Sequence, residues 1–361
     1  MPKIVIAAGG TAGHVVPALA VADALRARGA DVEFIGGERA EAELIPAAGY
    51  PFHRVRVRGL ERRKPLQAAL TLLLAAGATL RSMRLLRSIG ADAVLGGGGY
   101  VAGPVGLAAK LTWRPLALTE ADSHLGVANR MLAPFAKRVF LAFPIEGRGG
   151  GRRGRRKWVV SGRAVPPGTG SADRASARAR FGIGPQEPCV LVFGGSLGAR
   201  RLNDAAVEAF GAGSPCAVLH ASGRRDHDDL RERLEQLGSP PYYHLHAYIE
   251  PFADALAAAD LVVARAGGSV MEIAAAGLPA VLVPYPYATA DHQTSNARFI
   301  ERAGAAVVVP DGELDGPRLA REVGTLLGAP QRLGAMANAA RAIARPDAAE
   351  RIADELIALA R

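Results

Sequence analysis

The sequence is poor in residues that staple small secreted domains, hold metal clusters or cross membranes. Only two of its 361 residues are cysteine, Cys189 and Cys216, which are too few for a disulfide framework and lack metal-ligand spacing. A reducing cytoplasm is therefore the expected compartment. The N-terminus enters a strand-like run at once, so no signal peptide is expected. An apolar stretch near residues 65–76 is interrupted by Gln67 and Thr71 and is too short to span a bilayer.

Lysine is also scarce, and the positive charge is concentrated in the first half of the chain. Five of the 44 basic residues are lysine, and the net charge is +10. Through Arg163 there are 25 Lys and Arg against 11 Asp and Glu, whereas the remainder has 19 against 23. A nucleic acid, an anionic membrane surface or a phosphorylated substrate would each account for this asymmetry. With 49% hydrophobic and 22% charged residues, a chain of this length is expected to form two globular domains.

The first glycine loop, residues 9–14 (Gly-Gly-Thr-Ala-Gly-His), follows a strand-like run and precedes a helical stretch at 15–25. Glycines at such a turn let backbone N–H groups approach an anion, and the helix N-terminus adds partial positive charge. The spacing differs from G-x-G-x-x-G, so a nicotinamide dinucleotide is not favoured. His14 stands where the loop becomes the helix. Alone, it is interpreted as a residue that caps or packs the first turn.

Both halves of the chain repeat the order strand, glycine loop, helix. A second loop at 96–104 precedes a helix at 105–111, and a third at 194–203 follows the strand Cys189–Phe193. Alternation of this kind predicts parallel sheets covered by helices, with ligands at the carboxyl ends of the strands. The other predicted strands are Ile4–Ala8, Val32–Ile35, Ala93–Leu95, Leu116–Leu118, Arg138–Leu141, Trp158–Gly162, Ala217–His220, Tyr243–His246, Leu261–Ala264, Ala280–Val283 and Ala305–Val309. Two such openings imply two similar domains that face each other across a cleft.

Three segments outside this repeat have more than one interpretation. Basic residues flank the apolar part of 62–87, so this stretch is either a helix that covers a sheet face or an interfacial helix on a membrane. The Gly- and Arg-rich segment 147–157 is an RNA-binding tail or, as we favour, a surface loop. The tail 347–360 is predicted to be a helix, with Asp347 and Glu350 in capping-box spacing.

Two stretches of the second half carry more specific chemistry than a glycine loop. In the first, Arg265 stands at a strand end, Gly267 and Gly268 form a tight turn, and Glu272 lies one to two turns into a helix. Small residues at a helix start suit a diphosphate, and an early carboxylate can accept hydrogen bonds from a ribose diol. In the second, residues 284–296 form a loop dense in donors and acceptors of the kind that sugar hydroxyls need.

Five motifs in order resemble those of the bacterial peptidoglycan N-acetylglucosaminyltransferases of glycosyltransferase family 28. They lie at Gly9–His14, Gly98–Pro104, Gly194–Asn203, Arg265–Pro279 and Asp291–Asn296. The resemblance spans nearly the whole chain. It implies an α/β fold with two Rossmann-like domains facing across a cleft, the GT-B type. The first would comprise 1–162 with the C-terminal helix 341–361 packed back on it, and the second 163–340.

The activity that the resemblance implies is inverting transfer of N-acetylglucosamine from UDP-GlcNAc to the 4-hydroxyl of the muramyl sugar of undecaprenyl-diphosphate-linked lipid I. Its implied catalytic residues are His14, as general base, and Glu120. The implied donor-binding residues are Thr11, Gly13, Arg163, Ser196, Tyr248, Ile249, Arg265, Gly267, Gly268, Glu272, Gln293 and Asn296. The implied acceptor and diphosphate residues are Gly10, Thr11, Gly99, Tyr100 and Asp122.

UDP-GlcNAc is expected as the donor substrate, with no cofactor and no metal. A peripheral position at the cytoplasmic face of the plasma membrane is expected through 62–87, with no nucleic-acid partner. Three segments depart from the family pattern: Thr119–Asp122, Gly162–Pro166, and Arg265–Glu272, which is one residue shorter than in some relatives. Because they bear on the acceptor, a transferase of the same architecture with another lipid or natural-product acceptor remains the alternative. A non-catalytic binder of anionic surfaces ranks last, since it leaves the second-half motifs unexplained.

Overall fold

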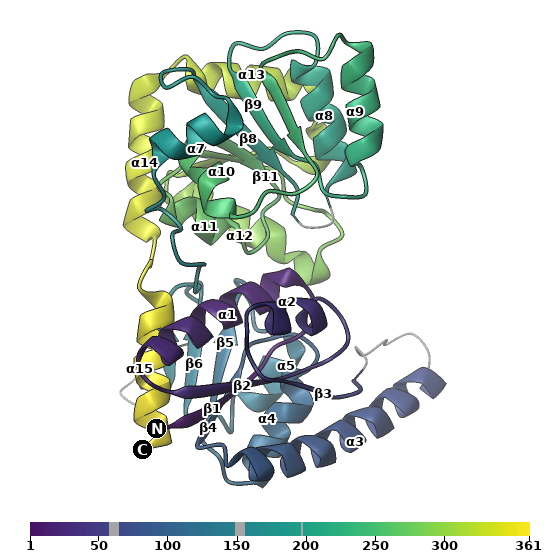
Figure 1. The fold of residues 1–361 in the computed structure, drawn as a ribbon, viewed down its shortest axis with the longest axis vertical. Helices are drawn as coiled ribbons and strands as arrows, with labels where there is room; N and C mark the ends of the chain where they lie inside the picture. The colour runs from purple at the N-terminus through teal and green to yellow at the C-terminus, as the bar shows by residue number, and fades with distance from the viewer. Residues whose placement is uncertain (58–64, 149–155, 196–197) are drawn as a thin grey trace. The chain divides into compact units, whose positions relative to one another are not determined.

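The computed structural model describes residues 1–57, 65–148, 156–195 and 198–361 and divides them into two compact units. Unit 1 contains Met1–Pro166 together with Arg345–Arg361, and unit 2 contains Pro167–Ala344. Figure 1 shows the helices and strands of both units.

Unit 1 is built on a seven-stranded sheet in which all neighbouring strands are parallel, in the order β3-β2-β1-β4-β5-β6-β7. The strands are β1 (Lys3–Ala7), β2 (Asp31–Gly36), β3 (Phe52–Arg54), β4 (Ala93–Gly96), β5 (Leu116–Glu120), β6 (Arg138–Leu141) and β7 (Trp158–Val160). The helices are α1 (Ala12–Ala27), α2 (Glu41–Ala47), α3 (Pro65–Ile89), α4 (Ala102–Leu111), α5 (Val127–Leu132) and α15 (Ala348–Ala360).

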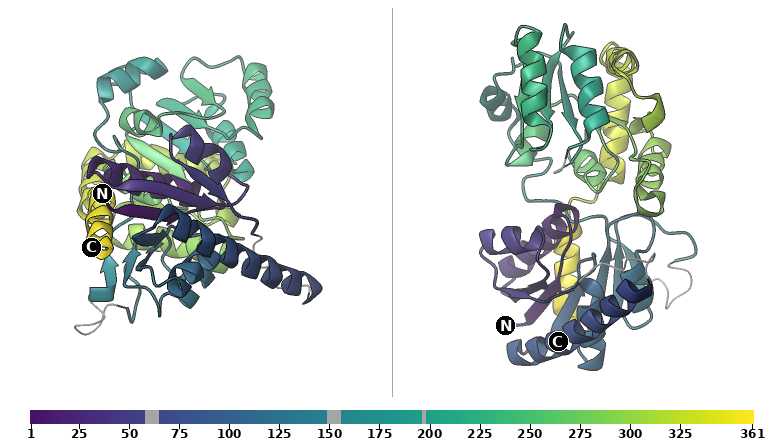
Figure 2. Two further views of the ribbon diagram at one scale, coloured as in Figure 1. Left: turned by 60° about the horizontal axis from the view of Figure 1, so that its bottom comes forward. Right: turned by 90° about the vertical axis from the view of Figure 1, so that its right-hand side faces the viewer.

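Helices cover both faces of this sheet, because alternate side chains of its buried strands point in opposite directions (Figure 2). Ile4 and Ile6 of β1 pack in one cluster with α1 and α15, to which Leu356 contributes. Val5 and Ala7 pack in a second cluster with α3, α4 and α5. The last helix of the chain is therefore part of the core of the first unit, where it lies along α1.

Unit 2 repeats the plan with a six-stranded parallel sheet in the order β10-β9-β8-β11-β12-β13. The strands are β8 (Cys189–Phe193), β9 (Ala217–Ala221), β10 (Tyr243–His246), β11 (Leu261–Ala264), β12 (Ala280–Leu282) and β13 (Ala306–Val308). The helices are α7 (Arg174–Phe181), α8 (Arg200–Phe210), α9 (His227–Gln236), α10 (Phe252–Ala258), α11 (Val270–Ala275), α12 (His292–Arg302), α13 (Gly316–Leu327) and α14 (Pro330–Ile343), with short 3-10 turns η1 (Thr289–Asp291) and η2 (Asp311–Glu313). Val190 and Val192 pack against α8 and α13 on one face, and Phe193 meets Phe252 of α10 on the other.

These sheets confirm the predicted class of two Rossmann-like α/β domains, and every predicted strand coincides with an observed one to within two residues at each end. One strand was missed: β3 is three residues long and follows Pro51 directly, so it shows no period-two pattern. That the two units face each other across a cleft stays a prediction.

Three details differ from the sequence expectations. Unit 1 continues past residue 162 to Pro166, because Ala164 is buried in the α1–α15 cluster. The segment 341–361 is not one helix of unit 1: residues 341–343 end α14 in unit 2, and α15 starts at Ala348. The predicted capping box is wrong, because Asp347 caps α15 without a side-chain hydrogen bond.

Some predicted features fall outside the described residues. These are residues 62–64 of the basic–apolar stretch, most of the Gly- and Arg-rich segment (149–155), and Ser196. Of the helices in the described part of the chain, none is both long and apolar enough to cross a membrane.

Candidate functional site

Each sheet reverses its strand order at one point, and the predicted motifs follow the strands that flank it. In unit 1 the reversal lies between β1 and β4, which lead into the first and second glycine loops. In unit 2 it lies between β8 and β11, which lead into the third loop and the Arg265 segment. Open parallel sheets bind ligands at such topological switch points, outside the carboxyl ends of the strands. Each unit therefore has a candidate site.

His14 lies in the first turn of α1 and is partly exposed. Its Nδ1 atom is 3.4 Å from the hydroxyl oxygen of Thr11, the residue that caps α1. Although threonine is a common N-cap, this hydroxyl makes no cap hydrogen bond and faces the imidazole instead. When Nδ1 carries the proton and donates a hydrogen bond to Thr11, Nε2 is the ring nitrogen with the basic lone pair.

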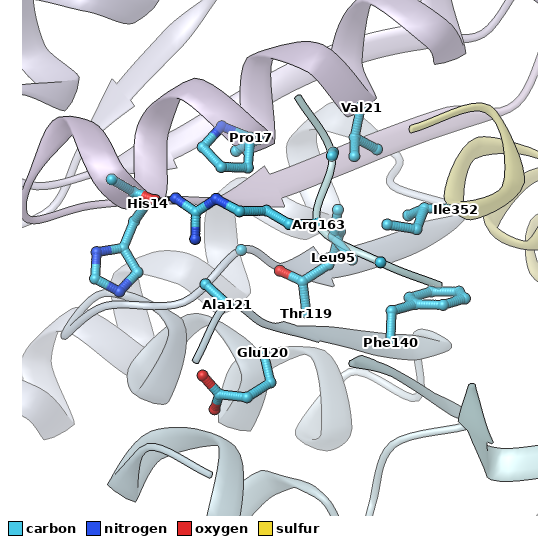
Figure 3. Close-up of a pocket in the computed structure, with 15 residues that line it drawn as sticks. His14, Pro17, Val21, Leu95, Thr119, Glu120, Ala121, Phe140, Arg163 and Ile352 are labelled. Carbon is cyan, nitrogen blue, oxygen red and sulfur yellow. Dashed lines mark hydrogen bonds between the residues drawn. The ribbon is translucent and has the colours of Figure 1, made fainter. Parts of the chain in front are cut away.

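A pocket in unit 1 is lined by His14 together with Gly97 of the second loop, Glu120 and Arg163 (Figure 3). Apolar side chains, among them Leu95 and Phe140, form part of its wall. Several predicted residues therefore meet at one place, although they come from loops more than 20 residues apart in the chain.

Arg163 reaches across this pocket to the start of α1 (Figure 3). Only 6% of the residue is exposed, and its guanidinium donates a hydrogen bond to the backbone carbonyl oxygen of Gly13. Arg163, Thr11 and Gly13, all expected among the donor contacts, belong to unit 1, whereas the other described donor residues belong to unit 2.

Glu120 is 7% exposed and is held by three donors from the segment that follows it. Its carboxylate accepts hydrogen bonds from the Gly126 amide at 2.8 Å, the Asn129 side chain at 2.9 Å and the Asp122 amide at 3.3 Å. Burial raises the pKa of this carboxyl, although the hydrogen bonds from Asn129, Gly126 and Asp122 oppose the shift. The geometry suits a residue that orders the 121–126 segment at the pocket edge.

On the acceptor side, Gly10 and Tyr100 share a partner that sequence reasoning missed. The amide of Gly10 donates to the Glu41 carboxylate at 2.9 Å, and the hydroxyl of Tyr100 donates to the same group at 2.8 Å. The Gly10 amide, expected to face an anionic ligand, thus faces a carboxylate of the protein. Gly99 has a φ of +74°, and a Cβ there would overlap the carbonyl oxygen of Gly9, so the two loops approach as closely as glycines allow.

In unit 2, Arg265 is fixed by a buried ion pair at the end of β11. It is 7% exposed, and its guanidinium lies 2.6 Å from the Asp311 carboxylate and 3.1 Å from the carbonyl oxygen of Val283. It also lies over the ring of Tyr285. Gly267 and Gly268 follow it and are partly buried.

The polar loop after β12 is held against this segment by side-chain amides. Gln293 accepts a hydrogen bond from the Tyr285 amide at 2.9 Å, and the fully buried Asn296 donates to the carbonyl oxygen of Ala266 at 3.3 Å. Just before Gln293, Ala290 and Asp291 both adopt positive φ, at 53° and 51°. Backbone of this kind is costly for non-glycine residues and is found preferentially at ligand-binding loops.

Tyr248, Ile249 and Glu272 also belong to unit 2. Ile249 is buried, whereas Tyr248 is 51% exposed with the Arg224 guanidinium above its ring. Burial of its hydroxyl raises the pKa of Tyr248, and the charges of Glu250 and Glu272 add to this effect, so Glu272 lies within electrostatic reach of the tyrosine. Two of the expected donor residues, Tyr248 and Glu272, therefore lie in the same region of unit 2.

Sequence reasoning also missed a buried polar network beneath the third loop. Asn203 of α8 bonds to the Ser222 carbonyl, the Asp226 carboxylate and the His220 ring, and that ring bonds to the Tyr243 hydroxyl at 2.8 Å. The signal was present, since Asn203 is the last residue of the third motif. In the described ranges, no three His, Cys, Asp or Glu side chains are grouped to hold a metal ion.

Comparison with known proteins identifies the family of the chain. The model of the glycosyltransferase family 28 N-terminal domain matches residues 4–141, and that of the C-terminal domain matches residues 189–352. The chain therefore belongs to glycosyltransferase family 28.

Relatives that match along almost their full length have the same name, UDP-N-acetylglucosamine--N-acetylmuramyl-(pentapeptide) pyrophosphoryl-undecaprenol N-acetylglucosamine transferase. The chain is 41% identical over 372 residues to that of Salinibacter ruber, covering 99% of this chain and 97% of the relative. It is 42% identical over 356 residues to that of Methylococcus capsulatus, covering 97% of each. The crystal structure of Acinetobacter baumannii MurG is similar with a TM-score of 0.77 and 30% identity, covering 99% of this chain and 100% of that one.

Proposed function

We propose that this protein transfers N-acetylglucosamine from UDP-GlcNAc to the 4-hydroxyl of the muramyl sugar of undecaprenyl-diphosphate-linked lipid I, giving lipid II for peptidoglycan synthesis. The observation that supports this most strongly is the likeness to transferases of that name over almost the entire length of both chains. The polar residues gathered at the two switch points support the same reaction.

The chemistry is an in-line displacement at the anomeric carbon, with inversion. The acceptor oxygen forms the new bond to that carbon as the bond to the diphosphate oxygen breaks and UDP leaves. Nε2 of His14 takes the hydroxyl proton, while Thr11 holds Nδ1. General base catalysis of this kind contributes about 10²–10⁴-fold. No cofactor or metal takes part in this proposal.

In unit 2, the donor nucleotide is proposed to lie along Tyr248, Ile249 and Glu272, with the ribose hydroxyls donating to the Glu272 carboxylate. Its diphosphate lies at the third loop with Ser196 and at the Gly267–Gly268 turn, and its sugar at Gln293. Arg265 and Asn296 act by holding these segments together, as their contacts to Asp311 and Ala266 indicate.

For a lipid-linked acceptor, we propose peripheral attachment to the cytoplasmic face of the plasma membrane through unit 1. On α3, Leu73 is 71% and Leu80 58% exposed, and Arg81, Arg84 and Arg87 are exposed on the same helix. Trp113, 86% exposed after α4, and Met131, 68% exposed on α5, are further exposed apolar side chains of unit 1, and the Lys110 ammonium lies over the Trp113 ring. Apolar side chains among cations are typical of interfacial binding to anionic lipid.

The deciding experiment is transfer of labelled GlcNAc from UDP-GlcNAc to a short-chain lipid I analogue. A labelled disaccharide product is expected, and absence of product with an active control transferase would contradict the proposal. The altered segment Thr119–Asp122 favours one alternative, a different lipid or natural-product acceptor, so a panel of such acceptors belongs in the same assay.

Membrane attachment is tested separately, by flotation with vesicles that contain anionic lipid. Binding that weakens with salt and falls on the triple change Arg81→Gln, Arg84→Gln and Arg87→Gln is expected. Equal flotation of variant and parent would contradict attachment through α3.

A further inference from the structure

Glu41, at the start of α2, is a buried acid that no sequence motif marks. Its residue exposure is 0%, and its carboxylate accepts three hydrogen bonds from three separate segments. Oε2 accepts from the Gly10 amide of the first loop at 2.9 Å. Oε1 accepts from the Gly37 amide after β2 at 3.0 Å and from the Tyr100 hydroxyl of the second loop at 2.8 Å. One carboxylate thus joins both glycine loops of unit 1.

The three hydrogen bonds offset the free-energy cost of burying the Glu41 carboxylate. A carboxylate removed from water costs far more than a neutral group unless donors replace its lost hydration. Glu41 has such donors on both oxygens. Burial, followed by the hydrogen bond to Glu41, raises the pKa of Tyr100 to about 12, so the phenol keeps its proton and remains a donor at neutral pH.

The backbone around Glu41 is shaped to admit this group. A Cβ added to Gly37 would lie 2.8 Å from Oε1 of Glu41, and one added to Gly9 would lie 3.0 Å from the same atom. Glycine at these positions leaves room for the carboxylate and also for two residues of the second loop, since a Cβ would lie 2.2 Å from the Tyr100 hydroxyl at Gly37 and 2.5 Å from the Val101 side chain at Gly9.

The two loops that Glu41 joins also enclose His14. On one side, His14 follows Gly10 in the first loop. On the other, a Cβ at Gly98 would lie 2.7 Å from Cδ2 of the His14 ring, so the second loop is in contact range of the imidazole. Any change in the separation of the loops displaces this ring relative to the groups that line the pocket.

We propose that Glu41 is a positioning residue for the transfer reaction: by holding the first and second glycine loops together, it sets the place of the His14 imidazole relative to the acceptor hydroxyl. This inference rests on the proposed function for its effect on turnover. Displacement of a reacting group by about 1 Å can cost about 100-fold in rate, so a residue that touches no substrate can control it.

The test compares Glu41→Gln with Glu43→Gln, an exposed acid on the same helix that loses the same charge. An amide nitrogen in place of one carboxylate oxygen cannot accept from a backbone amide. For Glu41→Gln, kcat/KM for the lipid I analogue is expected to fall by about 10- to 100-fold. The UDP-GlcNAc affinity, measured by calorimetry, is expected to stay within about twofold, because the residues proposed to hold the nucleotide, among them Tyr248 and Glu272, belong to unit 2.

Both variants are assayed at a temperature where circular dichroism shows them fully folded, so that lost stability alone does not count as lost positioning. If Glu41→Gln does not fold, Glu41→Asp keeps the charge but is one methylene too short to reach both loops, and it is expected to lower the same kcat/KM. Acceptor kinetics of the folded variant equal to those of Glu43→Gln would overturn the proposal, as would an equal loss of donor affinity.

A second measurement does not depend on turnover and so separates this inference from the proposed function. In NMR spectra of the full-length chain, the amide signals of Gly10 and Gly98 and the ring signals of His14 are expected to move in Glu41→Gln and to stay in place in Glu43→Gln. If these signals move but no acceptor is glycosylated by the parent protein, the proposed function fails while the loop bridge stands. If they do not move, the bridge is wrong whatever the activity.

Discussion

His14 and His220 lie near a glycine loop in units 1 and 2 respectively, yet their surroundings are opposite. His14 is partly exposed at the edge of a pocket, and its Nδ1 atom lies 3.4 Å from the Thr11 hydroxyl oxygen. His220 is fully buried in β9, where its Nε2 donates a hydrogen bond to the side-chain oxygen of Asn203 and its Nδ1 accepts one from the Tyr243 hydroxyl. Burial lowers the pKa of His220 to about 3, so this ring stays neutral and cannot exchange protons with a substrate. Access to the pocket, rather than residue type, distinguishes a histidine suited to proton transfer from a structural one.

The sharpest test of this contrast is His14→Ala. Because the imidazole is the proposed base for the acceptor hydroxyl, kcat is expected to fall by about 10²–10⁴-fold. UDP-GlcNAc binding by calorimetry should remain unchanged. Turnover close to that of the parent protein would remove His14 from the mechanism and the distinction between the two histidines with it.

The buried cation at the switch point of unit 2, Arg265, is paired with the Asp311 carboxylate, whereas Arg163 in unit 1 donates to the backbone carbonyl oxygen of Gly13. Arg265→Ala leaves Asp311 without its guanidinium partner, and breaking a buried pair of this kind costs about 3–5 kcal/mol. A lower unfolding transition for unit 2 and weaker UDP binding are expected by calorimetry. The matched variant Arg318→Ala removes a more exposed arginine of the same unit and should change both quantities little.

Glu272→Ala tests donor binding in unit 2, whereas His14→Ala tests proton transfer in unit 1. Loss of a charged acceptor for the ribose hydroxyls is expected to weaken UDP affinity by about 1.5–3 kcal/mol. At saturating donor, kcat should be nearly retained, which is the reverse of the pattern expected for His14→Ala. An unchanged dissociation constant for UDP would contradict the ribose assignment.

The smallest effect is expected for His220, which makes the stability of the folded protein depend on pH. Its folded pKa is about 3 and its unfolded pKa is near 6.5, so below pH 6.5 the unfolded state binds the additional proton. Stability is therefore lost as the pH falls from about 6.5 towards 3, by up to about 1.4 kcal/mol per pH unit. His220→Gln should be less stable at pH 7.5 but lose less on transfer to pH 5.0, measured by chemical denaturation. Parallel losses in both proteins would show that His220 does not carry this dependence.

The fold could be predicted from the sequence because its strongest signals are local. Apolar runs such as Cys189–Phe193 lie between glycine loops and helical stretches, and that order specifies parallel sheets. Domain limits were less predictable, since they depend on which core buries a residue such as Ala164. Ala164 belongs to the core of unit 1, so the boundary between the units lies after it, at Pro166.

The motif residues of the candidate site were predictable from the sequence, but the residues that hold them in place were not. His14, Arg265 and Gln293 stand in motifs, whereas Glu41 and Asp311 lie outside them. Their roles arise from contacts between segments distant in the chain, such as the 59 residues that separate Glu41 from Tyr100. The spacing of residues along a sequence does not show which distant residues are in contact. Glu120 was predicted as a catalytic residue, and its three bonds to the 121–129 segment add a supporting role.

The position of α15 has a consequence for how the protein is made. Ile352 and Leu356 of this helix fill the core of unit 1 alongside α1, and Arg28 and Arg138 pair with Asp354 and Glu355 on the same helix. A ribosome synthesises these residues after those of unit 2. Unit 1 therefore cannot complete its core until α15 has been synthesised, while unit 2, whose residues are contiguous, can finish first. A recombinant fragment that stops at residue 166 would leave the apolar side of α1 in water.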